Sequence, residues 1–260
     1  MNQSIKPYEN YCKWPLEKPL AEKGFIVAAD QTLEWLLPWW WERYTKYNDF
    51  PVTFVDLGLS KEMKNWCKKQ GHYIRLPVPD VFVVDPKEDL EKIMKEELGP
   101  NFSISRNAWF KKPLSCLQSP YELSVWMDID CEIKGSLHSI FSLPLPSSGI
   151  ALAQKYCIDY PCDINSGVIL FQRGIPIMEA WAKEALKNNQ PYVGDENILY
   201  DFMMRGEVYI ENLPHIYNWS RRFDHNPDAL VIHWHGRHGK SFISHQLQKS
   251  MLEKEGLLFC

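Results

Sequence analysis

Two aspartates one residue apart, Asp128 and Asp130, directly follow the apolar run from Val125 to Met127. In an extended segment residues i and i+2 point to the same side, so the two carboxylates can converge on one point while Ile129 faces away. Two negative charges at so short a distance repel each other, and a bound divalent cation usually neutralises them. Aspartate is also common in turns after strands. The pair therefore predicts either a metal site or a simple turn.

The composition restricts the class of protein. The chain has 260 residues, and nearly half are apolar, which is enough for a sizeable core. Its 33 acidic and 29 basic residues give a net charge of −4, which argues against a dedicated nucleic-acid binder. No apolar run approaches the ~20 residues that span a membrane, and the N-terminus lacks an apolar signal core. We therefore expect a cytoplasmic protein, although export without a cleavable signal stays open.

The seven cysteines are scattered along the chain, and none of them forms a C-x-x-C pair. A zinc ribbon needs such pairs. The pattern therefore favours reduced thiols that are mostly buried.

Apolar runs and helix signals alternate along the first part of the chain. They predict a strand, a helix, a strand, a helix and a strand at residues 24–29, 32–44, 52–56, 62–70 and 73–76. This alternation is typical of a parallel α/β sheet with right-handed crossovers. Ligands of such sheets bind beyond the carboxyl ends of the strands, which is where Asp30 and Asp128 stand.

The rest of the chain predicts further elements of the same kind. We expect helices at 89–98, 106–117, 176–187, 194–202 and 244–255, and strands at 122–127, 168–172, 208–210 and 229–232. Residues 1–22 are interpreted as an irregular N-terminal lead-in. Residues 23–260 are interpreted as a single domain, because no repeat or long linker divides them.

Four segments, taken in order, resemble the signature of one enzyme family. They are Val27-Ala28-Ala29-Asp30, Trp126-Met127-Asp128-Ile129-Asp130, Asn165-Ser166-Gly167-Val168 and His233-x-x-Gly236. The chain resembles a GT-A-fold glycosyltransferase over roughly residues 24 to 240. The nearest type is glycosyltransferase family 8, which includes glycogenin and bacterial galactosyl- and glucosyltransferases. This resemblance implies a mixed, mostly parallel central sheet flanked by helices.

The resemblance implies a metal-dependent transfer of a hexose from a UDP-sugar to an unidentified acceptor, with retention of configuration. A divalent cation would neutralise the diphosphate as it leaves. The implied ligands are Asp128, Asp130 and His233. Mixed carboxylate and imidazole ligands favour Mn²⁺ over calcium, and Mg²⁺ is also possible. His235 is better explained as a hydrogen-bonded or exposed histidine.

The resemblance also assigns residues to donor binding, each with a simpler alternative. Ala28 and Asp30 would meet the uracil or ribose, although Asp30 could instead cap the next helix. Arg106 would contact the donor phosphate or sugar, or be a solvated helix residue. The resemblance places Asn165 and Ser166 at the donor sugar, although these residues could equally form a turn. It places Gly236 and Lys240 at the diphosphate. The family lysine falls at the position of Gly239, so Lys240 is one residue out of register.

The segment Gly194-Asp195-Glu196 resembles the family's Asp-Gln pair near the reacting carbon of the sugar. Asp195 matches the pattern, whereas Glu196 replaces the usual glutamine. Both are implied catalytic residues, and neither is assigned as a nucleophile. Simple capping by acids at a helix N-terminus is the alternative.

Two other functions stay open. A catalytically silent nucleotide-sugar-binding protein would carry the same motifs. A nucleotidyltransferase on a related fold usually has a glycine-rich loop after the first strand, where this chain has Asp30-Gln31-Thr32. The acceptor cannot be inferred, because acceptor pockets are built from variable loops such as residues 77–88 and 212–228. Glucose, galactose and N-acetylglucosamine all fit the motif as the donor sugar.

Overall fold

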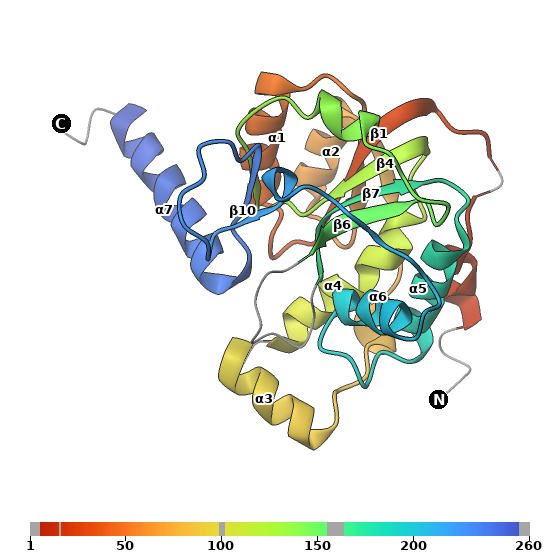
Figure 1. Cartoon of the computed structure of the whole chain (residues 1–260). Helices are drawn as coiled ribbons and strands as arrows, with labels where there is room; N and C mark the ends of the chain where they lie inside the picture. Colours follow the sequence, from red (N-terminus) through yellow and green to blue (C-terminus); the bar gives the residue numbers. More distant parts are fainter. Residues whose placement is uncertain (1–5, 16, 99–101, 155–163, 255–260) are drawn as a thin grey trace.

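A seven-stranded sheet forms the centre of the protein, in the order β3-β2-β1-β4-β7-β6-β8 (Figure 1). The computed structural model describes residues 6–15, 17–98, 102–154 and 164–254. The strands are β1 (Ala21–Ala29), β2 (Val52–Asp56), β3 (His72–Arg75), β4 (Tyr121–Met127), β6 (Ile150–Gln154), β7 (Ile164–Gln172) and β8 (Glu211–Asn212). Strands β1 to β4 run parallel, whereas β7 runs antiparallel to both β4 and β6. The sheet is therefore mixed and mostly parallel, as predicted.

Helices cover both faces of this sheet because successive strand residues point to opposite faces. On β1, Phe25 and Val27 belong to one apolar core and Ile26 to the other. The first core is completed by α1 (Leu36–Tyr47) and α2 (Lys61–Gln70). The second is completed by α4 (Phe102–Cys116), α5 (Pro176–Lys187) and α6 (Asp195–Met204) (Figure 1). The remaining helix of this part, α3 (Glu88–Leu98), contacts α4.

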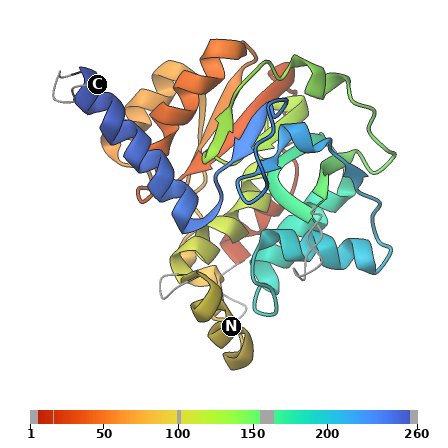
Figure 2. The same cartoon turned by 60° about the vertical axis from the view of Figure 1, so that its left-hand side comes forward.

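A second sheet of three strands adjoins the end of β4. Its order is β5 (Cys131–Ile133), β10 (Val231–His233) and β9 (Trp219–Ser220). The antiparallel pair of β5 and β10 places His233 opposite Cys131. Strand β10 leads into α7 (Gly236–Lys254), which lies on the side of the molecule away from α5 and α6 (Figures 1 and 2). Short 3-10 helices are η1 (Lys6–Cys12), η2 (Asp80–Phe82), η3 (His138–Ser142) and η4 (His215–Tyr217).

Several predicted boundaries are wrong. Helix α1 begins at Leu36 because residues 31–35 form a turn whose N–H groups bond to Asp30. Helix α7 begins at Gly236 rather than Ser244, so Gly236 and Lys240, which were expected at the diphosphate, lie at the start of a helix. Residues 208–210 are not a strand, and β8 follows them. The lead-in contains η1 and buries Cys12 in the core. The single domain over residues 23–260 stays a prediction.

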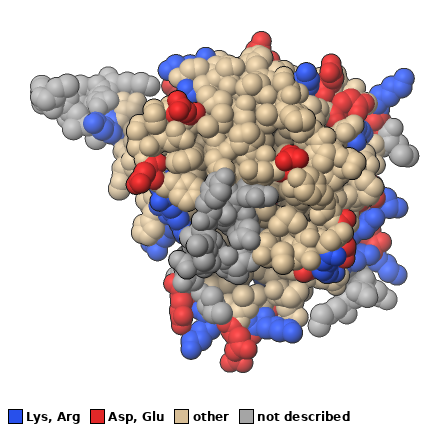
Figure 3. Space-filling model, in the orientation of Figure 1, with Lys and Arg blue, Asp and Glu red and all other residues tan. Residues whose placement is uncertain are grey.

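The cysteines of the described residues are buried and free, in agreement with the prediction. They are Cys12, Cys67, Cys116 and Cys131. Cys157, Cys162 and Cys260 lie outside the described residues. On the face seen in Figure 3, the basic and acidic side chains that the structure describes are interspersed around the rim. None of the described helices has the length and apolar character needed to cross a bilayer.

Candidate active site at the carboxyl end of strand β4

The two aspartates lie where β4 ends and the small sheet begins. The Asp128 N–H donates to Gly167 O over 2.7 Å, and the Cys131 N–H donates to Asp128 O over 3.0 Å, so the chain turns after Met127. Because β7 runs antiparallel to β4, its first residues lie beside this turn. Strand β10 brings His233 alongside Cys131. Three segments that are far apart in the sequence therefore meet at one point.

Asp130 and His233 face each other in a buried position. The Nε2 atom of His233 is 3.3 Å from Asp130 Oδ1 and 3.8 Å from Asp128 Oδ2. Lys240 Nζ lies 2.5 Å from Asp130 Oδ2. Burial would raise the pKa of Asp130, but the nearby charges of Lys240 and His233 outweigh it and hold that pKa well below its usual range.

The donor atoms at this point fit a divalent cation. Asp130, Cys131 and His233 each have one ligand atom within 4.8 Å of the other two. Burial raises the pKa of the Cys131 thiol well above its usual value, and only the thiolate binds metals strongly. Asp130 and His233 are therefore the better ligands. Asp128 is not in that group: its carboxylate accepts from Trp126 Nε1 over 2.8 Å and is 24% exposed.

Lys112, which sequence analysis missed, is a buried cation at the centre of the site. Its Nζ lies 3.1 Å from Asp128 Oδ1, 3.0 Å from Ser166 Oγ, 3.2 Å from Ser166 O and 3.6 Å from Asp195 Oδ2. Burial would lower the pKa of Lys112, but the charges of Asp128 and Asp195 outweigh it and raise that pKa. The ammonium thus holds the residues after β4 against those at the start of β7 and α6.

The acids at the start of α6 face the same centre. Asp195 Oδ2 accepts from Ser166 Oγ over 2.7 Å, and Glu196 Oε2 accepts from Ser166 N over 3.3 Å. Burial, only partly offset by the charge of Lys112, raises the pKa of Asp195 to about 6. The helix N-terminus itself is closed by the Asn197 side chain, which accepts from Gly194 N. The two carboxylates therefore do more than cap the helix.

Arg106 has a different environment from the expected donor contact. It is 1% exposed, and its guanidinium donates to the backbone oxygens of four residues over 2.7–3.2 Å. The four are Val84, Asn189, Tyr192 and Val193. These bonds tie the segment between η2 and α3, which contains Val84, to the loop between α5 and α6, which contains the other three residues. Arg106 therefore supports the site from behind, and Lys112 is the cation that faces it.

This correction has a measurable consequence. Arg106→Gln is expected to lower the free energy of unfolding by about 3 kcal/mol, because several buried carbonyls lose their donors. Chemical denaturation checks the loss. The folded fraction should keep the wild-type KM for the donor. A normal stability together with a raised donor KM would instead restore the role expected from the sequence.

Asp30 borders a cavity of about 260 Å³ at the carboxyl ends of β1 and β2. Its Oδ1 accepts from Thr32 N over 2.9 Å and from Leu33 N over 3.2 Å, so Asp30 closes the turn over residues 31–35 and does not cap α1, which has no side-chain cap. The cavity is also lined by Gln31, Leu57, Gly58, Asp80, Ile104, Ala108 and Lys111. Half-buried Ala28 lies two residues before Asp30 on β1. The cavity is therefore at the strand ends where a ligand was expected.

The residues around the start of α7 pack tightly against β10. Gly236 has a φ of +77°, which favours glycine, and a Cβ on Gly239 would lie 1.8 Å from Trp234 O. Gly236 is thus explained by its backbone conformation and Gly239 by close packing. His235 Nε2 bonds to Ser220 Oγ at 2.7 Å, which agrees with the interpretation of His235 as a hydrogen-bonded histidine. Burial, helped by the charge of His233, lowers the pKa of His235 to about 2.

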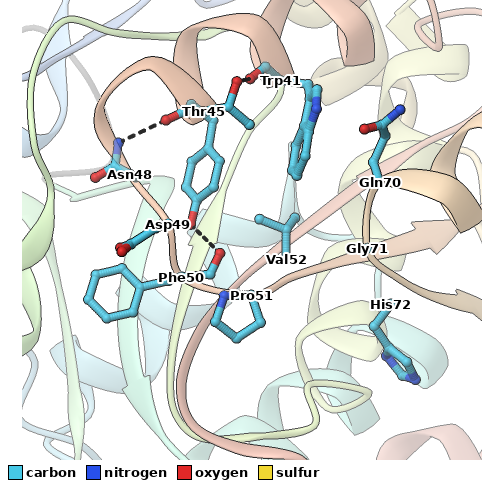
Figure 4. Close-up of a pocket in the computed structure, with 11 residues that line it drawn as sticks. Trp41, Thr45, Asn48, Asp49, Phe50, Pro51, Val52, Gln70, Gly71 and His72 are labelled. Atoms are coloured by element: carbon cyan, nitrogen blue, oxygen red, sulfur yellow. Dashed lines mark hydrogen bonds between the residues drawn. The ribbon is translucent and has the colours of Figure 1, made fainter.

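A second cavity, of about 300 Å³, lies at the opposite ends of the strands (Figure 4). It is lined by the end of α1 and the start of β2, including Tyr44, Asn48 and Val52. Tyr44 Oη donates to Phe50 O over 2.7 Å, and Asn48 Nδ2 donates to Tyr44 O over 3.3 Å (Figure 4). Because it adjoins the amino ends of β2 and β3, this cavity is separate from the site at Asp128.

Comparisons with known proteins give matches in structure but not in sequence. No protein-family model and no curated protein sequence matches the chain. The apo form of the glycosyltransferase GlyE from Streptococcus pneumoniae TIGR4 is 14% identical, with a TM-score of 0.54 over 92% of this chain. The chain spans only 64% of the length of that GlyE structure.

Two further solved structures share the arrangement. Mouse xyloside xylosyltransferase 1 is 12% identical, with a TM-score of 0.52 over 82% of this chain and 97% of its own. The galactosyltransferase LgtC, solved with donor and acceptor sugar analogs, is 13% identical, with a TM-score of 0.52 over 85% of this chain and 94% of its own. At these identities the likeness establishes the fold. The chain has the GT-A fold that the sequence resemblance predicted.

Proposed function

We propose that the chain is a metal-dependent glycosyltransferase that moves a hexose from a UDP-sugar to an acceptor with retention of configuration. One observation carries the proposal. At the carboxyl end of β4, the buried pair Asp130 and His233 lies beside Asp128, and the cation Lys112 links Asp128 to Asp195. Candidate metal ligands, a cation and acids thus converge at a strand end, where the ligands of such sheets bind.

The diphosphate end of the donor needs positive charge. Asp128, Asp130 and His233 would hold Mn²⁺ or Mg²⁺, which supplies a Lewis acid that neutralises the leaving diphosphate. The protein adds two ammonium groups of its own. Lys240 reaches the site from α7, and Lys112 reaches it from α4. Both can contact phosphate oxygens as point charges.

The nucleoside fits the cavity at the ends of β1 and β2. Asp30 lies on its wall, Gly58 leaves room on the other side, and Lys111 forms an ion pair with Asp80 at its edge. We assign the uracil and ribose to this cavity, with Ala28 and Asp30 as the contacts from β1. The diphosphate then points from the cavity toward Asp128.

The sugar end of the donor belongs beside Asp195, Glu196 and Ser166. Their oxygen atoms can accept hydrogen bonds from sugar hydroxyls. A carboxylate next to the anomeric carbon also stabilises the positive charge that develops there in glycosyl transfer. Glu196 carries such a carboxylate where the family usually has a neutral amide. Asn165 and Gly236 complete the donor-binding set implied by the resemblance.

Turnover of the donor tests this function. We expect Mn²⁺-dependent release of UDP from one member of a panel of UDP- and GDP-sugars, even without an acceptor, and none in chelator. Turnover of a GDP-sugar instead would contradict the donor assignment. Tight UDP binding with no release from any UDP-sugar, even after acceptor sugars are added, would identify a silent binder.

A further inference from the structure

The imidazole of His233 is held from behind by two amide side chains. Its Nδ1 atom lies 3.1 Å from Asn165 Oδ1 and 3.1 Å from Asn218 Oδ1, while Nε2 lies on the side of Asp130. His233 is 4% exposed and Asn218 is 5% exposed. Each nitrogen of the ring therefore faces buried polar groups: Nδ1 faces the two amides, and Nε2 faces Asp130.

The orientation of the two amides follows from their other hydrogen bonds. Asn218 Nδ2 lies 2.8 Å from Asn165 Oδ1 and 3.4 Å from Asn165 O, and both of these atoms only accept. Asn165 Oδ1 also accepts from Gly167 N over 3.0 Å. The amide nitrogen of Asn218 is thus directed at Asn165, which leaves its oxygen for His233.

Both atoms at the rear of the ring are consequently oxygens that cannot donate. A hydrogen bond to either of them requires a proton on His233 Nδ1. In a neutral ring with Nδ1 protonated, the lone pair is on Nε2, which faces Asp130 Oδ1 at 3.3 Å. Without a cation, that carboxylate can itself accept a hydrogen bond from a protonated Nε2, so the Nδ1–H tautomer is the one expected when a cation lies between Nε2 and Asp130. Metal-binding histidines are commonly fixed in this way by a partner on the second nitrogen.

We propose that Asn218, acting with Asn165, fixes His233 in the Nδ1–H tautomer and so directs the Nε2 lone pair at the cation. Asn218 is a positioning residue, since it acts only through His233. The inference rests on the proposed metal-dependent function. It gives Asn165 a role behind the ring in addition to the sugar contact implied by the resemblance.

Gly167 provides the space that this arrangement needs. A Cβ at this position would lie 2.2 Å from His233 Cε1 and 2.4 Å from Nδ1. Atoms at such distances overlap, so any larger residue would push the ring away from the two amides. The glycine of the Asn-Ser-Gly segment is therefore part of the same device.

A nitrogen NMR experiment on the full chain tests the tautomer directly. The protein is labelled with ¹⁵N-histidine, and His233 is assigned by the signals lost in His233→Gln. In alkaline buffer with saturating Mg²⁺, which is diamagnetic, we expect wild-type His233 to show a protonated Nδ1 and an unprotonated Nε2. A protonated Nε2 in the wild type would overturn the proposal, whatever any variant does.

Two matched variants complete the test. Asn218→Leu should shift His233 toward the other tautomer and weaken Mn²⁺ binding, measured by calorimetry, by about 10- to 100-fold. The control, Asn48→Leu, removes an equally buried asparagine that bonds to Leu137 N and Tyr44 O. It should lose stability yet keep the wild-type tautomer and affinity. An unchanged tautomer and affinity in Asn218→Leu would also overturn the proposal.

The same data separate this inference from the function on which it rests. A wild-type protein that binds no Mn²⁺ would contradict the metal-dependent function. Comparing the NMR signals of metal-free wild type and metal-free Asn218→Leu would still show whether Asn218 shifts the tautomer of His233. If the wild type binds Mn²⁺ and Asn218→Leu keeps the wild-type tautomer and affinity, only the positioning role of Asn218 is contradicted.

Discussion

Asp130→Asn is expected to lower the Mn²⁺-dependent release of UDP by about three orders of magnitude. The change keeps the shape of the side chain but removes the negative charge that faces His233 Nε2 and Lys240 Nζ. A catalytic cation contributes several kcal/mol of charge stabilisation, and each ~1.4 kcal/mol corresponds to a tenfold change in rate. Steady-state turnover at saturating donor measures the loss.

Glu132→Gln is the matched control for this variant. Glu132 is two residues further along the chain, on β5, but its carboxylate accepts from Trp234 Nε1 and pairs with Arg43 and Lys134. The Glu132→Gln substitution removes one carboxylate from the same segment and leaves the proposed metal ligands unchanged. Turnover of this control should stay close to wild type. Equal losses in the two variants would mean that the segment is needed for folding rather than for a cation.

Lys112→Met is expected to reduce both stability and turnover. The ammonium is buried between Asp128 and Asp195, and breaking a buried ion pair from one side costs about 3–5 kcal/mol. Removing one charged donor that faces the leaving group should also lower turnover by about 100- to 1,000-fold. Denaturation measures the first effect, and turnover of the folded fraction measures the second.

The neighbouring lysine provides the comparison. Lys111 pairs with Asp80, whose side chain is 61% exposed and is solvated when the lysine is lost. Lys111→Met should therefore cost about 1 kcal/mol or less. If Lys112→Met cost as little stability as Lys111→Met and kept the wild-type turnover, Lys112 would not be the centre of the site.

The sequence could predict those parts of the site that lie next to strand ends. These parts are Asp128, Asp130 and His233, which lie at or just after the ends of apolar runs. A strand end can be located in the sequence to within a residue or two, so the position of such a residue at the edge of the sheet can be predicted. The order of the motifs then indicated the GT-A fold. Ser166 and Asp195 were assigned through the family resemblance, and the structure places them near the start of β7 and at the start of α6.

The sequence could not show which of the three basic residues of α4, Arg106, Lys111 and Lys112, faces the site. Arg106 and Lys112 are six residues apart, or about 9 Å along a helix that rises ~1.5 Å per residue. Which of them reaches the strand ends depends on where α4 crosses the sheet, and no local pattern sets that. The structure buries both, but Arg106 bonds to backbone oxygens and Lys112 to carboxylates.

Asn218 and the start of α7 were missed for another reason. Asn218 lies in the segment 212–228, where the sequence shows no motif, and its partners come from β7 and β10. The glycines at 236 and 239 favour a loop by their local propensity. The structure instead has a helix there, in which Gly239 lies too close to Trp234 O for any larger residue, so this glycine reflects close packing and not a loop.

Titration of UDP into the protein with Mn²⁺ and with chelator tests the central claim most directly. The wild type should bind UDP in Mn²⁺, and the affinity should fall by at least tenfold in chelator, in line with a cation held between protein and diphosphate. The double variant Asp128→Ala, Asp130→Ala should show no dependence on Mn²⁺. Equal UDP affinity in wild type and double variant, with or without Mn²⁺, would contradict the metal site at the end of β4.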